Sequence, residues 1–147
     1  MLARVQSCAI LGIDSIPLAI EVDTSPGMQR FVIVGLPDAA IKESSERVTA
    51  AVKNSGFRTP RGTTLVNLAP ADIRKEGSAL DLPIALGILA STDQLRSETL
   101  GDYVIVGELA LNGAVRPVAG ALSMAIGARA KGMRGIVLPV DNAEEAG

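Results

Sequence analysis

The stretch that decides the fold runs from Val66 to Pro83 and reads VNLAPADIRKEGSALDLP. Its apolar start predicts a buried strand, which Pro70 ends because proline has no N–H group for the hydrogen-bond ladder. Pro83 suits the first turn of a helix, where a missing N–H group costs nothing. The stretch therefore predicts a strand and a helix, joined by a charged loop with a tight turn at Gly77 and Ser78.

The helix after this loop is apolar on almost every side from Leu80 to Ala90. Such a helix has to be covered all round, so we expect it at the centre of the molecule. The loop before it carries the polar residues Asp72, Arg74, Lys75, Glu76 and Ser78. A polar loop held before a helix N-terminus is a common place for binding or catalysis. A solvated connection, in which Gly77 only makes the turn, explains the same residues.

The composition favours a single domain, residues 1–147, with an aliphatic core. A chain of 147 residues buries roughly 68–70% of its unfolded surface, which is enough to fold without disulfides. Apolar residues make up 48% of the chain but aromatic residues only 2%. Valine, isoleucine, leucine and alanine therefore have to build the core. Aromatic stacking platforms for single-stranded nucleic acid are almost absent.

Charge and residue types exclude several functions. The net charge is −2, so nucleic-acid binding would need a local basic patch. The chain has no histidine and one cysteine, Cys8, which removes Ser-His-Asp catalysis, most zinc sites and an internal disulfide. We therefore expect no metal site. There is no Gly-Lys dipeptide, so the P-loop pattern for nucleoside triphosphates is missing.

The same sequence predicts a cytoplasmic protein with no membrane partner. No apolar run approaches the ~18 residues of a membrane span. No signal peptide precedes the first expected strand. A lone cysteine fits a reducing compartment.

Three short apolar segments open the chain and predict a meander of strands at residues 4–11, 16–22 and 31–34. Residues 35–38 close the meander and start a helix, with a proline in its first turn, and Gly56 ends this helix. One helix face carries Ile41, Ser45, Val48 and Val52. The opposite face carries the i, i+4 pairs Lys42–Glu46 and Glu43–Arg47.

Strands and helices alternate through the rest of the chain. The patterns predict a buried strand at 103–107, a hairpin at Asn112–Gly113, a helix at 119–131, a strand at 135–139 and the start of a helix at 141–147. The predicted fold class is therefore α/β, with an N-terminal strand meander followed by alternating helices and strands.

Several motifs resemble those of one family. They are Ile33-Val34-Gly35-Leu36-Pro37-Asp38 with Lys42-Glu43-Ser44, Asn67-Leu68-Ala69-Pro70-Ala71-Asp72, and Lys75-Glu76-Gly77-Ser78 with Leu82-Pro83-Ile84-Ala85. Together they look like the N-terminal domain of the magnesium-chelatase-related AAA+ ATPases of the ComM and YifB type. The resemblance covers essentially the whole chain.

This resemblance implies a two-layer α+β sandwich, the fold of the second domain of ribosomal protein S-five, which Lon protease and the RadA repair ATPase share. It implies that an AAA+ ATPase module follows residues 1–147. That module would form a hexamer and use ATP and magnesium, whereas no cofactor is implied for this chain. The resemblance further implies a branch-migration motor in DNA uptake and recombination, with its own ATPase module and DNA as partners.

The resemblance to Lon extends to the positions of its peptidase dyad. Lon-type domains carry Lys-Asp-Gly-Pro-Ser-Ala-Gly where this chain has residues 75–81, and an ungapped alignment places the nucleophilic serine on Ala79. The catalytic lysine of that family follows a segment that resembles residues 117–121, which places it on Leu122. Neither side chain can act as nucleophile or base, so the resemblance implies a pseudo-protease without catalytic residues. Ser78 with Lys75 as its base is the alternative, and it requires a shift of register.

Two short basic segments flank the central strand. Arg58 and Arg61 precede it, and Arg74 and Lys75 follow it. These four cations are the candidates for DNA binding. Because the two segments lie at opposite ends of one strand, they form a single patch only if the loops curl together. Scattered surface charge that only keeps the protein soluble explains them equally.

Two other functions remain open from the sequence. A phosphate- or nucleotide-binding domain would use the loop at Gly77 and Ser78, because backbone N–H groups before a helix can hold a phosphate. A role as the ATPase partner of a metal chelatase follows from the family's name alone.

Overall fold

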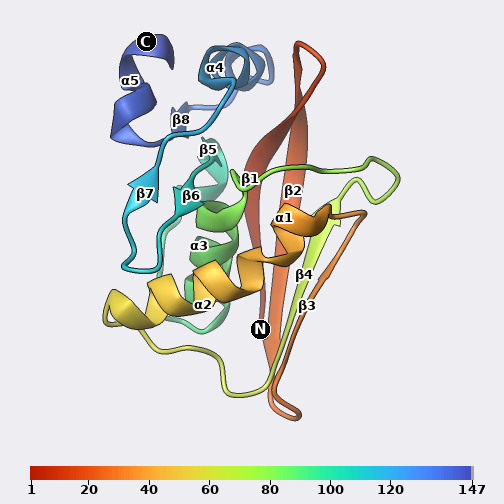
Figure 1. The fold of residues 1–147 in the computed structure, drawn as a ribbon, viewed down its shortest axis with the longest axis vertical. Coiled ribbons are helices and arrows are strands. Elements are labelled where there is room, and N and C mark those ends of the chain that lie inside the picture. Colours follow the sequence, from red (N-terminus) through yellow and green to blue (C-terminus); the bar gives the residue numbers. More distant parts are fainter. Residues whose placement is uncertain (147) are drawn as a thin grey trace.

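The computed structural model describes residues 1–146 as a mixed sheet with helices packed on it (Figure 1). The strands are β1 Leu2–Leu11, β2 Asp14–Ser25, β3 Arg30–Val34, β4 Thr63–Ala69, β5 Tyr103–Ile105, β6 Glu108–Leu109, β7 Val115–Arg116 and β8 Gly135–Val137. The helices are α1 Ala39–Lys42, α2 Ser44–Asn54, α3 Asp81–Ser91, α4 Ala121–Ala130 and α5 Ala143–Ala146, with 3-10 turns at Leu100–Asp102 and Val140–Asn142.

The main sheet has the strand order β3-β4-β2-β1-β5-β8. β1 and β2 form the expected antiparallel hairpin. The prediction of a three-strand meander is wrong, because β4 lies between β2 and β3. β4 runs antiparallel to β2 and parallel to β3. Gly62 permits this insertion, since a Cβ atom there would lie 2.1 Å from the Ser25 carbonyl oxygen.

The central helix α3 covers one face of the sheet together with α2 (Figure 1). Val5 and Val22 point to this face and are fully buried. α3 comes close to them at Gly87, where a Cβ atom would lie 2.5 Å from a methyl group of Val22. The helix occupies 81–91, which confirms the sequence prediction of a buried central helix.

On the opposite face, α4 lies over the turn end of the β1–β2 hairpin and beside β8, and a Cβ atom at Gly127 of α4 would lie 2.9 Å from Ser15 of β2. There Met124 and Ala128 of α4 pack against Cys8 and Val104. The expected two-layer arrangement thus describes the sheet at β3 and β4, and α4 adds a partial layer on the second face over β2, β1 and β8. This arrangement places the ends of β1 and β7, the loop before α3 and the start of α4 around one cleft.

Two details of the first helical segment differ from the expected pattern. The segment is interrupted at Glu43, so that Ser44, and not Ser45, is fully buried. The Glu43–Arg47 ion pair forms at 3.3 Å. The predicted Lys42–Glu46 pair is not among the ion pairs of residues 1–146.

The β6–β7 hairpin confirms the turn predicted at Asn112–Gly113. Gly113 has a φ angle of +93°, a backbone conformation that glycine adopts without steric cost. The hairpin lies beside the N-terminal end of α3, where the amide of Leu109 reaches a carboxylate of that helix at 3.0 Å.

Candidate functional site

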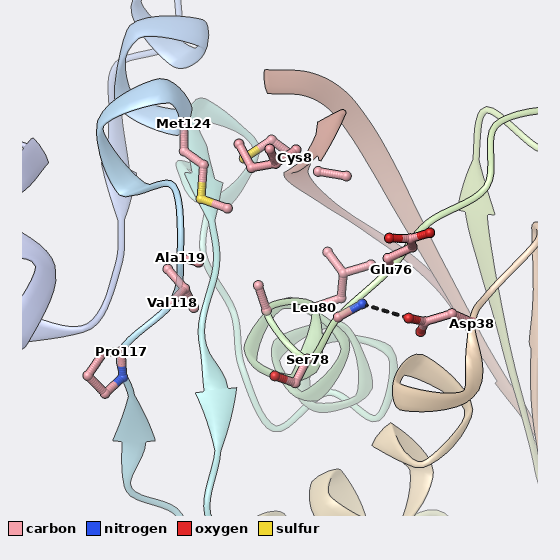
Figure 2. Close-up of a pocket in the computed structure, with 13 residues that line it drawn as sticks. Cys8, Asp38, Glu76, Ser78, Leu80, Pro117, Val118, Ala119 and Met124 are labelled. Atoms are coloured by element: carbon pink, nitrogen blue, oxygen red, sulfur yellow. Dashed lines mark hydrogen bonds between the residues drawn. The ribbon is translucent and has the colours of Figure 1, made fainter. Parts of the chain in front are cut away.

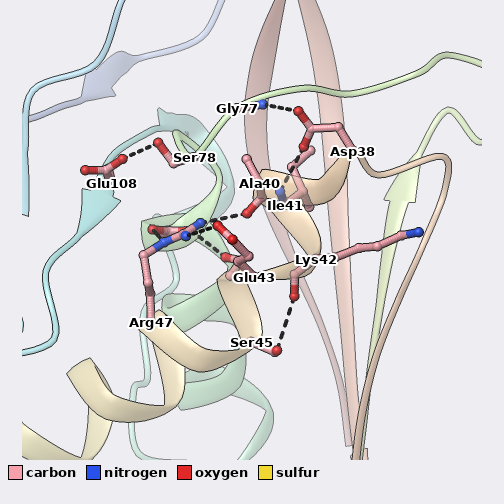
Figure 3. Close-up of polar contacts among 12 residues, drawn as sticks. Asp38, Ala40, Ile41, Lys42, Glu43, Ser45, Arg47, Gly77, Ser78 and Glu108 are labelled. Atoms are coloured by element: carbon pink, nitrogen blue, oxygen red, sulfur yellow. Dashed lines mark hydrogen bonds and ion pairs between the residues drawn. The ribbon is translucent and has the colours of Figure 1, made fainter.

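The loop after β3 and the loop before α3 are hydrogen-bonded to each other (Figure 3). The amide of Lys75 donates to the Leu36 carbonyl at 3.0 Å, and the amide of Asp38 donates to the Lys75 carbonyl at 3.0 Å. Pro37 and Lys75 thereby form a short parallel bridge. Two motifs that are about 40 residues apart in the chain are therefore one structural unit.

The carboxylate of Asp38 holds both loops in place. One oxygen accepts from the Ile41 amide at 2.8 Å and caps α1, and the other accepts from the Gly77 amide at 3.0 Å. Gly77 has a φ angle of +90°, which confirms that the turn needs a left-handed backbone. Its N–H group already has a carboxylate partner, which argues against a phosphate at this position.

Lys75 lies in the interior and is 0% exposed. Its ammonium group donates to the Gly35 carbonyl at 2.7 Å and also to the Pro70 carbonyl. Burial lowers the pKa of Lys75, while Asp72 raises it by a smaller amount. The expectation that Lys75 contacts DNA is therefore wrong, because its charge ties two strand ends together and does not reach solvent.

Next to this unit lies an open cleft of about 440 Å³. It is lined by Cys8, Ala9, Ile10, Asp38, Glu76, Gly77, Ser78, Ala79, Leu80, Pro117, Val118, Ala119 and Met124 (Figure 2). Most of this lining is apolar. The charged side chains of this lining are the carboxylates of Asp38 and Glu76, which stand on one side of the cleft. The lining contains no cationic side chain that could bind an anion.

The two residues that align with the peptidase dyad of Lon, Ala79 and Leu122, provide neither a nucleophile nor a base. Ala79 lines the cleft with a methyl group, and Leu122 is 50% exposed on α4. The Ser78 hydroxyl donates to the Glu108 carboxylate (Figure 3). The Lys75 ammonium group donates to the carbonyl groups of Gly35 and Pro70, so it is not placed to act as a base for Ser78. Burial raises the pKa of the Cys8 thiol, which keeps it protonated and unreactive.

Sequence reasoning missed a buried ion pair at the N-terminus of α3. The Asp81 carboxylate is fully buried and accepts from the Arg47 guanidinium at 2.7 Å and 3.1 Å. It also accepts from the Ser44 hydroxyl and the Leu109 amide. The pair raises the pKa of Arg47. The sequence signal for this ion pair was the acidic Asp81 in the first turn of an apolar helix. A favourable interaction with the helix dipole explains an acid at this position equally well.

The candidate DNA-binding arginines are separated by the full length of β4. Arg58 and Arg61 come before its first residue, and Arg74 follows its last. Seven residues of strand span about 20 Å at roughly 3.3 Å per residue. Arg74 is largely exposed and lies 3.7 Å from Glu76. The structure therefore brings Arg58 and Arg61 together and keeps Arg74 apart.

None of the helices within residues 1–146 has the length and the apolar character that a membrane span requires. The same residues contain no group of three or more histidine, cysteine, aspartate or glutamate side chains that could hold a metal ion.

Comparisons with known proteins match this chain to one family. The model of the ChlI subunit of magnesium chelatase matches residues 20–142. The chain is 44% identical to YifB of Escherichia coli over 146 residues, which are 99% of this chain and 29% of that protein. It is 45% identical to the competence protein ComM of Haemophilus influenzae over 145 residues, or 99% of this chain and 28% of that protein.

A more distant relative supports the expected fold. The peroxisomal Lon protease homolog 2 of Caenorhabditis elegans is 30% identical over 135 residues, which are 87% of this chain and 17% of that protein. The sheet and its helices are thus Lon-like. The chain spans less than a third of the length of the YifB and ComM relatives. It belongs to the family of the ChlI subunit of magnesium chelatase.

Proposed function

We propose that this chain is a non-catalytic accessory domain of a hexameric AAA+ ATPase that remodels DNA. The observation that supports the proposal is a Lon-like fold in which aliphatic side chains align with the expected dyad positions. Ala79 and Leu122 align with the dyad positions, and the hydroxyl of the neighbouring Ser78 is hydrogen-bonded to the Glu108 carboxylate. A fold of this kind retains a rigid scaffold and an open cleft, and it can serve binding without hydrolysis.

The comparison with longer relatives supports the accessory role. The chain corresponds to 28–29% of ComM and YifB, which leaves room in such proteins for an ATPase module. ATP and magnesium would bind that module. The name of ComM refers to competence, and this favours DNA as the substrate of the assembled motor. Its own ATPase module and further copies of the chain would be the other partners.

The test measures ATP turnover by a full-length protein of this type that contains the chain. Three candidate substrates are compared: a four-way DNA junction, unfolded casein, and a porphyrin with magnesium. The proposal expects that DNA stimulates ATP turnover and that the other two do not. Stimulation by casein with release of peptides would support a protease instead. Stimulation by the porphyrin alone would support the chelatase role.

A further inference from the structure

A second cleft lies beside the residues that precede β4, whereas the Gly77 loop follows the last residue of this strand. It has a volume of about 510 Å³ and is lined by Lys53, Phe57, Arg58, Thr59, Pro60, Arg61, Thr92 and Gln94. Its walls come from the end of α2, the loop before β4 and the segment after α3. The fold thus adds Lys53 to the two arginines that the sequence had placed together.

The lining of this cleft contains three cations and no carboxylate. Lys53, Arg58 and Arg61 are exposed, and within the described 146 residues none of them forms an ion pair. Asp93 lies in the chain between the lining residues Thr92 and Gln94, but its carboxylate forms an ion pair with Arg96 at 2.6 Å. A chain with a net charge of −2 therefore has a local concentration of positive charge, which attracts polyanions.

The loop that carries the arginines is held by a side-chain amide. The Gln94 amide oxygen accepts from the Arg58 backbone N–H at 2.8 Å, and the Gln94 amide nitrogen donates to the Arg58 carbonyl at 2.9 Å. The same nitrogen contacts the Thr92 hydroxyl at 2.9 Å. A backbone fixed in this way loses little conformational entropy when its side chains bind a ligand.

Phe57 gives the cleft an exposed aromatic ring. Phe57 is 44% exposed, although a phenylalanine is usually buried. It lines the basic cleft and also an adjoining apolar groove of about 150 Å³ between α2, α3 and the β6–β7 hairpin. An exposed ring beside cations suits a ligand that carries both a planar base and a phosphate.

We propose that the Lys53–Arg58–Arg61 cleft binds single-stranded nucleic acid, with phosphates on the three cations and a base against the ring of Phe57. Stacking on an aromatic face is tolerant of base identity, and phosphate contacts carry no sequence information. The site therefore binds without sequence preference. An acidic peptide would match the charge but would have no planar group for the ring. The inference deepens the proposed role in DNA remodelling and rests on it for its biological setting.

The test measures binding of a labelled oligothymidine of about 15 nucleotides, a length on the scale of known single-strand sites, by fluorescence anisotropy at several salt concentrations. The 147-residue chain is compared with Arg58→Gln/Arg61→Gln and with Phe57→Leu. Loss of two phosphate contacts reduces the slope of log K against log salt by about 1.4, at roughly 0.7 per contact for single strands. Loss of stacking lowers affinity by about fivefold to a hundredfold and leaves the slope unchanged.

The matched control is Arg129→Gln/Lys131→Gln, which removes the same charge at the end of α4, away from the cleft. Its affinity and slope should equal those of the unchanged protein. The proposal is overturned if the chain does not bind the oligonucleotide at low salt, or if control and cleft variants lose affinity equally. It is also overturned if polyglutamate, or ATP at the same phosphate concentration, displaces the oligonucleotide as well as unlabelled strand does.

Failure of this test leaves the proposed ATPase role standing, because that role is measured by ATP turnover of the full-length protein. Conversely, a full-length protein stimulated only by casein or porphyrin would remove the role in DNA remodelling, whatever the isolated chain binds.

Discussion

Replacing Asp81 by alanine should destabilise this domain more than any exposed ion-pair change. The Asp81 carboxylate is fully buried and joins α3 to α2 and to β6. Without it, the Arg47 guanidinium, which is only 20% exposed, loses its main partner. The Leu109 amide and the Ser44 hydroxyl lose their acceptor as well.

The magnitude follows from the cost of breaking a buried ion pair by removing one partner, which is about 3–5 kcal/mol; the exposed Glu43 carboxylate, 3.3 Å from Arg47, replaces Asp81 only in part. A domain of this size loses roughly 2–4 °C of Tm per kcal/mol. We therefore expect Asp81→Ala to lower Tm by about 6–20 °C. The double variant Asp81→Ala/Arg47→Met should lose less stability than the sum of its single changes, because it removes both members of the buried pair and leaves only the exposed Glu43 without its partner.

Thermal and urea unfolding, followed by circular dichroism, measure this effect. Asp93→Ala is the matched control, because it removes a carboxylate from the exposed Asp93–Arg96 pair, and its Tm should stay within error of the unchanged protein. If Asp81→Ala and Asp93→Ala melt at the same temperature, the buried pair does not hold the three elements together and the reasoning is refuted.

Three further predictions concern the loop before α3. Gly77→Val should cost about 1–3 kcal/mol, because its φ angle is +90°, and Ser78→Ala should cost less; equal denaturation midpoints would contradict this. Since burial lowers the folded-state pKa of Lys75 below its ordinary 10.5, the unfolded state binds more protons just below that pH and stability should rise with pH there. The rise should disappear in Lys75→Met, and an identical pH profile would contradict it. The chain should not cleave unfolded casein, because Ala79 and Leu122 occupy the dyad positions; cleavage abolished by Ser78→Ala would overturn this.

The local patterns predicted the elements of the fold well. The apolar run at 80–90 and the turn at Asn112–Gly113 each needed only neighbours in the chain. The position of β3 could not be read in this way, because strand pairing depends on contacts between distant segments. An apolar strand pattern is the same whether β2 or β4 is its neighbour.

The chemistry of single residues was harder to predict than the elements. Lysine is almost always exposed, so nothing local revealed that carbonyls of Gly35 and Pro70 would surround Lys75. In the sequence, Asp81 looked like an acid that interacts only with the dipole of its own helix, and its partner Arg47 lies on another helix. Lys53 belongs to the end of a helix, and only the fold brings it to Arg58 and Arg61.

The most direct test of the central claim compares migration of a four-way DNA junction by a full-length protein with and without the domain of residues 1–147. The account predicts ATP-dependent migration by the intact protein, and loss of migration with retention of ATP hydrolysis when the domain is removed. Unchanged migration without the domain, or ATP-dependent cleavage of casein by the intact protein, would contradict it.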